Sequence, residues 1–150
     1  MVFPGGDYDA MRPTARQGKI DFAGRRGYVR TAIGAGVPIV PVVSIGGQEN
    51  QLYLFRGTEI AKLLGPVARA VRAKIVPLSF GFPFGFSLFA TLPPNLPLPT
   101  KIVTQVLAPI DIAAQFGNKP NVDAVDAHVR KIMQDALDKL ATDRRFPILG

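Results

Sequence analysis

The chain has 150 residues, 47% hydrophobic and 19% charged; its apolar surface suffices for a core, which excludes an intrinsically disordered tail. Cysteine is absent and histidine occurs once, which excludes a disulfide framework, a cysteine nucleophile, and thiolate or multi-histidine metal sites. Lys and Arg outnumber Asp and Glu by 18 to 11; most of the excess lies in residues 1–74 (11 against 5) and indicates an anionic partner: phosphate, nucleic acid or an acidic membrane surface.

The first part of the chain has the pattern of a βαβ unit. Residues 1–3 indicate the end of a strand, and residues 7–24 a polar, basic, irregular loop. Apolar spacing predicts a helix over residues 25–35, ended by Gly36. The unalternating apolar run 38–45 predicts a strand covered on both faces. We therefore expect an α/β fold with a mostly parallel sheet and covering helices, incomplete at its N-terminal side because the chain opens inside a strand.

The later elements are simpler. Residues 52–55 are ambiguous between strand and helix, and residues 58–73 predict a helix with one apolar and one basic side. Residues 101–108 predict a strand. The most regular pattern spans residues 121–142, where apolar residues recur at helical spacing behind Asn121, a good N-cap.

Three short blocks are candidates for a binding site. Phe-Pro-Gly-Gly at residues 3–6 indicates either a plain turn or a glycine nest whose N–H groups approach an oxyanion. Arg25 and Arg26 open the first helix, and they indicate either a phosphate clamp or a solvated basic turn. Pro41 lies inside the strand at 38–45, where proline predicts a bulge or an edge; a plain core strand is the alternative.

In order and spacing these blocks resemble the lysophospholipid/glycerolipid acyltransferase family, especially its monoacylglycerol and diacylglycerol acyltransferase branch. The resemblance spans at least residues 2–49, from Phe-Pro-Gly-Gly through Arg-Arg-Gly-Tyr-Val-Arg-Thr-Ala to Val-Pro-Ile-Val-Pro. It implies a transfer from acyl-CoA, or acyl carrier protein, to a glycerolipid hydroxyl without a metal or bound cofactor, peripherally on the cytoplasmic face of a membrane. The substrate-binding residues that it implies are Phe3, Pro4, Gly5, Gly6, Arg12, Arg25, Arg26 and Pro41.

The sequence also departs from the family pattern. The family's catalytic His-x-x-x-x-Asp, placed upstream of the Phe-Pro block, does not occur: the single histidine is His128, and Met133 stands five residues later. Gly5 and Tyr8 replace the Glu and Arg of members that use a phosphate-bearing acceptor. No catalytic residue is therefore assigned, and His128 is expected on the helix surface. We expect the C-terminal part of a single acyltransferase domain, inactive alone, with acceptor motifs in 1–49, an apolar segment in 75–100 and a helix over 121–142.

Residues 75–100 carry no charge and contain six prolines, so they do not form one straight transmembrane helix. Part of this segment alternates phenylalanine with glycine, proline or serine, which is the period of a core strand. Glycine and proline pack poorly there, so the alternatives are a loop that dips into a lipid interface or the wall of an acyl-chain tunnel. The predicted membrane-contact residues are Phe80, Phe82, Phe84, Phe86 and Phe89.

Two other functions compete with acyl transfer. A non-catalytic peripheral membrane module would use the same phenylalanine segment and basic half without any chemistry. A nucleic-acid-binding domain is suggested by the net charge of +7 alone. The phenylalanine segment has no interleaved Lys or Arg for base stacking, so no nucleic-acid partner is expected. The sequence does not indicate an oligomeric state.

Overall fold

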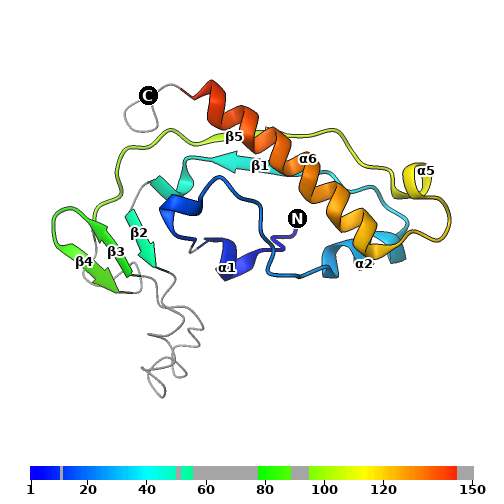
Figure 1. The fold of residues 1–150 in the computed structure, drawn as a ribbon, viewed down its shortest axis with the longest axis horizontal. Coiled ribbons are helices and arrows are strands. Elements are labelled where there is room, and N and C mark those ends of the chain that lie inside the picture. The colour runs from blue at the N-terminus through cyan, green and yellow to red at the C-terminus, as the bar shows by residue number, and fades with distance from the viewer. Residues whose placement is uncertain (11, 50–51, 56–77, 89–94, 145–150) are drawn as a thin grey trace, which may run out of the picture. The chain divides into compact units, whose positions relative to one another are not determined.

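A computed structural model of the chain forms two compact units, each described here by itself (Figure 1). The first unit comprises residues 1–6, 18–45 and 102–145, and the second comprises residues 7–17, 46–101 and 146–150. The residues that the structure describes are 1–10, 12–49, 52–55, 78–88 and 95–144.

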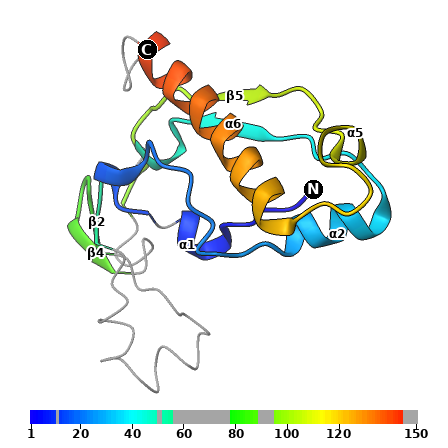
Figure 2. The same cartoon turned by 45° about the vertical axis from the view of Figure 1, so that its right-hand side comes forward.

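The first unit combines a two-stranded sheet with helices. Strands β1 (Val42–Ile45) and β5 (Val103–Val106) run antiparallel, with Val43 opposite Gln105. The long helix α6 (Val122–Asp143) crosses this pair and packs against β1 (Figures 1 and 2). Helix α2 (Gly27–Ala35) also contacts α6, and the short helix α5 (Ile112–Phe116) precedes it.

Local hydrogen bonds explain where these helices begin and end. Helix α2 ends at Gly36, whose φ of +63° is left-handed; its N–H donates to Ile33 O, and Val37 N–H donates to Ala32 O. Helix α6 begins after Asn121, whose Oδ1 accepts from the N–H groups of its first turn at 2.8 and 3.2 Å. Both helices lie within two residues of the ranges that the sequence predicts.

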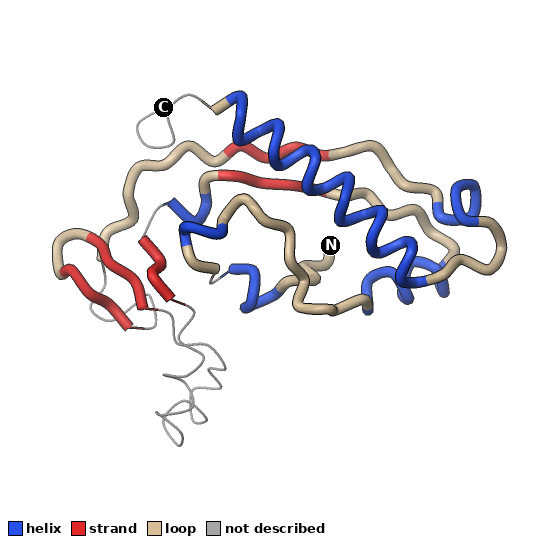
Figure 3. The backbone as a smooth tube through the Cα atoms, viewed as in Figure 1, coloured by secondary structure: helices blue, strands red, loops and turns tan. Residues whose placement is uncertain are grey.

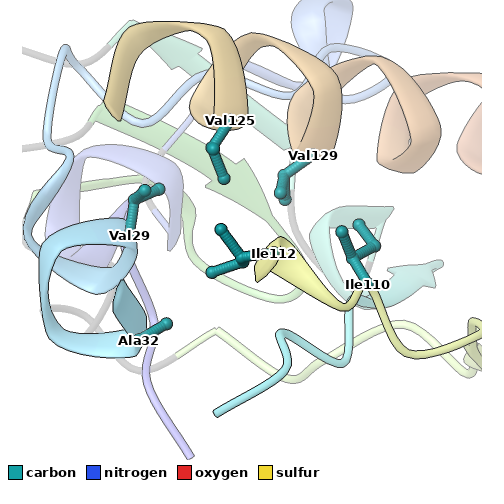
Figure 4. Packing of buried hydrophobic residues seen from close by; sticks show 6 residues of the cluster. All are labelled: Val29, Ala32, Ile110, Ile112, Val125 and Val129. Atoms are coloured by element: carbon teal, nitrogen blue, oxygen red, sulfur yellow. The ribbon is translucent and has the colours of Figure 1, made fainter. Parts of the chain in front are cut away.

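The core of the first unit lies where α2, α5 and α6 meet (Figure 4). Its side chains are almost entirely withdrawn from solvent, and each valine or isoleucine contributes roughly 1.5–3 kcal/mol by its burial. Because these side chains come from three separated stretches of sequence, their packing holds those stretches of the first unit together. The cluster consists of Val29, Ala32, Ile110, Ile112, Val125 and Val129.

The second unit contains a three-stranded antiparallel sheet in the order β2-β3-β4 (Figure 3). Its strands are β2 (Leu52–Phe55), β3 (Leu78–Gly81) and β4 (Gly85–Leu88), and β3 and β4 form a hairpin. The register between β2 and β3 shifts between Tyr53 and Phe55.

Two 3-10 turns accompany this sheet, η1 (Thr14–Arg16) and η2 (Gly47–Glu49). The first is held to the edge of β2, because Tyr53 N–H donates to the hydroxyl of Thr14 at 2.9 Å. Gln17 Nε2 also donates to Glu49 Oε1 at 3.1 Å. Together with the short helix α1 (Gly6–Ala10), η1 gives regular structure to a stretch that the sequence predicts to be irregular.

The predicted fold class is wrong: among the described residues every strand pair is antiparallel, and none is parallel. The expected first strand is absent, because Met1, Val2 and Phe3 are exposed and lie outside any strand. Without a strand before α2 there is no βαβ unit, and β1 instead pairs with β5, which returns in the opposite direction. The expectation of a sheet that is incomplete at its N-terminal side rested on a strand at residues 1–3, and these residues form no strand.

Other expectations have mixed outcomes. The interruption of the strand at 38–45 is confirmed: Ile39 forms an isolated bridge with Ile110, and β1 begins only after Pro41. The strand predicted at 101–108 is β5, and residues 52–55 form a strand rather than a helix. The helix expected at 58–73 lies outside the described residues. In the part of the chain that the structure describes, no helix is long and apolar enough to span a membrane.

Candidate functional site

The Phe-Pro-Gly-Gly block forms a closed turn, here called the Phe3–Gly6 turn. Gly6 N–H donates to Phe3 O at 3.1 Å, and Gly6 has a φ of +51°, a conformation that favours glycine. Gly5 is buried and Pro4 half-buried, whereas Phe3 is 74% exposed. Gly6 N–H is therefore already engaged inside the protein, so the turn is not a nest of free N–H groups at that position.

Arg25 packs directly on the Phe3–Gly6 turn. Its Nη1 donates to Gly5 O at 2.7 Å, and a Cβ placed on Gly6 would lie 2.8 Å from the same nitrogen. Because glycine has no Cβ, position 6 leaves space for the guanidinium of Arg25. The backbone of Arg25 is itself held by a turn, since its N–H donates to Phe22 O at 3.0 Å. The structure brings Gly5, Gly6 and Arg25 together.

Arg26 has a different set of partners from its neighbour. One guanidinium nitrogen donates to Asp123 Oδ1 at 2.5 Å, and its Nε lies 3.9 Å from Asp126 Oδ2. Both carboxylates belong to the first turns of α6. The two adjacent arginines therefore do not form the joint clamp around one anion that their sequence suggests, because each is directed to its own acceptor.

Asp126 is a buried polar centre that the sequence analysis missed. It is 3% exposed; Tyr28 OH donates to its Oδ1 at 2.8 Å, and Arg130 Nε donates to its Oδ2 at 2.9 Å. Burial, and then the hydrogen bond to Asp126, raise the pKa of Tyr28 above its usual value. One available signal was the four-residue spacing of Asp126 and Arg130, which places opposite charges side by side on a helix.

The other predicted residues are also engaged. Arg12, in the second unit, is 3% exposed; it forms an ion pair with Asp9, and its Nη1 lies 3.5 Å from Arg16 O. Pro41, in the first unit, is buried, and its carbonyl accepts from Leu107 N–H at 2.9 Å. Among the described contacts of the first unit, Pro41 does not join the turn at residues 3–6.

The phenylalanine segment forms the β3–β4 hairpin, and its side chains do not form a core. Phe80, Phe82, Phe84 and Phe86 are between 46% and 69% exposed. The core-strand interpretation therefore does not fit these residues. Phe89 lies outside the described residues.

His128 is half-buried on α6, where its ring meets Phe116 edge to face at 5.4 Å between centroids. The expectation that it is a surface residue is therefore only partly met. Its ring serves packing in this position. Within the described ranges, no group of three or more His, Asp or Glu side chains is arranged to hold a metal ion.

Comparison with known protein families gives one match. The model described as diacylglycerol acyltransferase matches residues 1–145. Among curated proteins and among solved structures, none matches the chain. The matched range includes the Phe3–Gly6 turn, Arg25 and Arg26 before α2, and the whole of α6.

Proposed function

We propose, since this chain belongs to the diacylglycerol acyltransferase family, that it provides the acceptor side of an acyl transfer to a diacylglycerol. The family consists of membrane-associated acyltransferases of glycerolipid metabolism that use acyl-CoA and diacylglycerol. In this reaction the free hydroxyl attacks the thioester carbonyl, a C–O bond forms and the C–S bond breaks. The hydroxyl proton passes to a general base and finally to the CoA thiolate.

The observation that carries this proposal is the contact of Arg25 with Gly5 O at 2.7 Å within the family match. This contact supports the proposal that the Phe3–Gly6 turn is preorganised to bind the acyl acceptor, because its two glycines present no side chain to a ligand. In this proposal Arg25 positions the turn. Pro41 is buried just before β1 and makes no described contact with the turn, so we give it no direct contact with the acceptor. Arg26 is already paired with Asp123, so we assign it to the framework of the first unit rather than to direct contact with the acceptor. Arg12 of the second unit is paired with Asp9, and we give it no role at the acceptor.

We further propose that the 150-residue chain is inactive alone, as the C-terminal part of one acyltransferase domain, peripheral on the cytoplasmic face of the membrane. The support is chemical. Transfer needs a base close to the acceptor hydroxyl, and the single histidine packs against Phe116 with no aspartate five residues later. Acyl-CoA is the expected donor.

The test is an acyl-transfer assay with labelled acyl-CoA and diacylglycerol in mixed micelles. It compares the 150-residue chain with a longer protein that includes any residues encoded in frame before Met1. We expect product from the longer protein and none from the chain alone. Clear turnover by the chain alone would show that it holds its own general base.

A second candidate is the non-catalytic membrane module, which the exposed phenylalanines of the β3–β4 hairpin favour. The same two proteins distinguish it from the enzyme. Binding to vesicles without any acyl transfer, even by the longer protein, would support the module and contradict the proposed reaction.

A further inference from the structure

The β3–β4 hairpin is apolar outside and polar inside. Phe80 and Phe86 are directly opposite in the register, and their exposed rings meet edge to face at 5.3 Å between centroids. The neighbouring cross-strand pair, Ser79 and Ser87, is 0% and 1% exposed. In water a hairpin normally buries its aromatic face and exposes its small polar residues, so this arrangement is reversed.

Three backbone polar groups at the tip of the hairpin are paired within the protein. Phe84 N–H donates to Asn95 Oδ1 at 3.0 Å, and Asn95 Nδ2 donates to Gly85 O at 2.9 Å. Leu96 N–H donates to Phe82 O at 2.7 Å. Asn95 itself is only 7% exposed. These bonds replace the water that a hairpin tip usually binds.

Gly81 makes this arrangement sterically possible. A Cβ on Gly81 would lie 3.0 Å from the Asn95 side chain, closer than an ordinary contact. Residues 75–100, which include the hairpin and Asn95, carry no charge. Internal partners for three backbone groups of the tip, the absence of charge and the aromatic rings outside all favour entry into a lipid interface.

We propose that the β3–β4 hairpin inserts Phe80, Phe82, Phe84 and Phe86 into the interface of a lipid bilayer, with Asn95 as the internal partner that lets the tip leave water. Membrane association of the family favours a bilayer over a protein as the occupant. The absence of charge predicts insertion into neutral as well as anionic lipid. The proposal does not depend on acyl transfer, so each can fail separately.

The chain contains no tryptophan, which permits a single fluorescent reporter. Phe84→Trp places it at the hairpin tip, and Ile102→Trp places a control at a site of the first unit that is 61% exposed. With phosphatidylcholine vesicles, we expect Phe84→Trp to shift its emission to the blue and to be quenched by brominated acyl chains. Ile102→Trp should show neither effect.

Equal responses of the two reporters, or none from Phe84→Trp, would overturn the proposal. So would insertion that requires phosphatidylserine and disappears in high salt, because the basic surface would then drive binding. Phe82→Ser with Phe84→Ser should weaken vesicle partitioning at least about tenfold, whereas Ile102→Ser should change it less than about twofold. An unchanged partition coefficient for the double variant would also contradict insertion.

Asn95→Ala in the Phe84→Trp background tests the role of the asparagine. We expect quenching to fall several-fold while the far-ultraviolet circular dichroism is retained, because Phe84 N–H and Gly85 O lose their internal partner. Full quenching in this variant would remove Asn95 from the proposal. If the variant does not fold, the serine variants still decide whether the hairpin inserts.

Discussion

Arg25 serves a turn that lies 20 residues earlier in the sequence. Its guanidinium donates to Gly5 O and occupies the space beside Gly6 that a side chain would need. From the sequence, its charge indicated either part of a phosphate clamp or a solvated basic turn. The contact with Gly5 O adds a positioning role, since a charged donor on a carbonyl fixes the geometry of the turn.

Gly6→Ala and Arg25→Ala should therefore be non-additive. Each should lower the free energy of unfolding by about 1 kcal/mol. A Cβ at position 6 is strained at positive φ and displaces the guanidinium, and Arg25→Ala removes the hydrogen bond to Gly5 O. The double variant should lose about 0.5–1 kcal/mol less than the sum, because both changes remove the same hydrogen bond. Urea unfolding measures this cycle. Gly18→Ala, where a Cβ meets nothing within 4 Å, is the control; strict additivity would refute the coupling.

At the scale of the element, α2 shows how far local chemistry reaches. Its end was predictable, because Gly36 adopts the left-handed conformation that closes the last turn through bonds to residues only a few positions earlier. The hairpin shows the opposite case. Its alternation indicated a strand correctly, but periodicity alone did not say whether Phe80 and Phe86 lie in a core or outside.

Two glycine substitutions in α2 should act in opposite directions. Gly34 lies inside the helix with open space around it, so Gly34→Ala should stabilise the protein by about 0.5–1 kcal/mol. Gly36 also has open space, but its φ is +63°, so Gly36→Ala should destabilise by about 1 kcal/mol. Thermal unfolding of the pair measures both. Shifts of the same sign would mean that conformation is not the controlling factor.

At the scale of the whole molecule, contacts distant in sequence decide the architecture. Tyr28 of α2 and Asp126 of α6 are 98 residues apart and share a hydrogen bond, and the core beneath them joins the same helices. In the first unit β1 pairs with β5, which follows it by about sixty residues and runs in the opposite direction. The parallel sheet expected from the βαβ pattern was wrong, because none of the described residues before α2 forms a strand.

Burial of Tyr28, and then its hydrogen bond to Asp126, make unfolding sensitive to alkaline pH by raising the pKa of the phenol. The pKa of Tyr28 is raised above 10.0 in the folded protein, so folding holds the phenol proton more tightly than the unfolded chain does. This stabilisation is complete below pH 10 and is lost as pH rises through the higher folded value. Urea unfolding between pH 8 and 11.5 should show a falling stability that is shallower in Tyr28→Phe. Identical slopes in the parent protein and in Tyr28→Phe would contradict this prediction. A smaller slope should remain in Tyr28→Phe, because burial also raises the pKa of Tyr53.

The local parts of the candidate site could be predicted from sequence, but its internal contacts could not. The turn at residues 3–6 and the helix that starts after Arg26 were indicated because backbone turns and helix starts are encoded in neighbouring residues. The binding role of these residues stays a prediction. The partners of Arg26, and the buried positions of Asp126 and Asn95, could not be found in the same way. A polar residue is buried only when distant groups satisfy it, and one sequence does not show which groups meet.

The sequence by itself determined the helix ends at Gly36 and Asn121, the break in the strand before Pro41, and the motif order that resembles acyltransferases. Each of these depends on residues within a few positions of one another. Only the tertiary structure decided that the sheets are antiparallel, that Arg25 holds Gly5, and that the phenylalanines of the hairpin face outward. Those features depend on contacts between segments far apart in the chain, whose stability comes from the packing and hydrogen bonding of the folded whole.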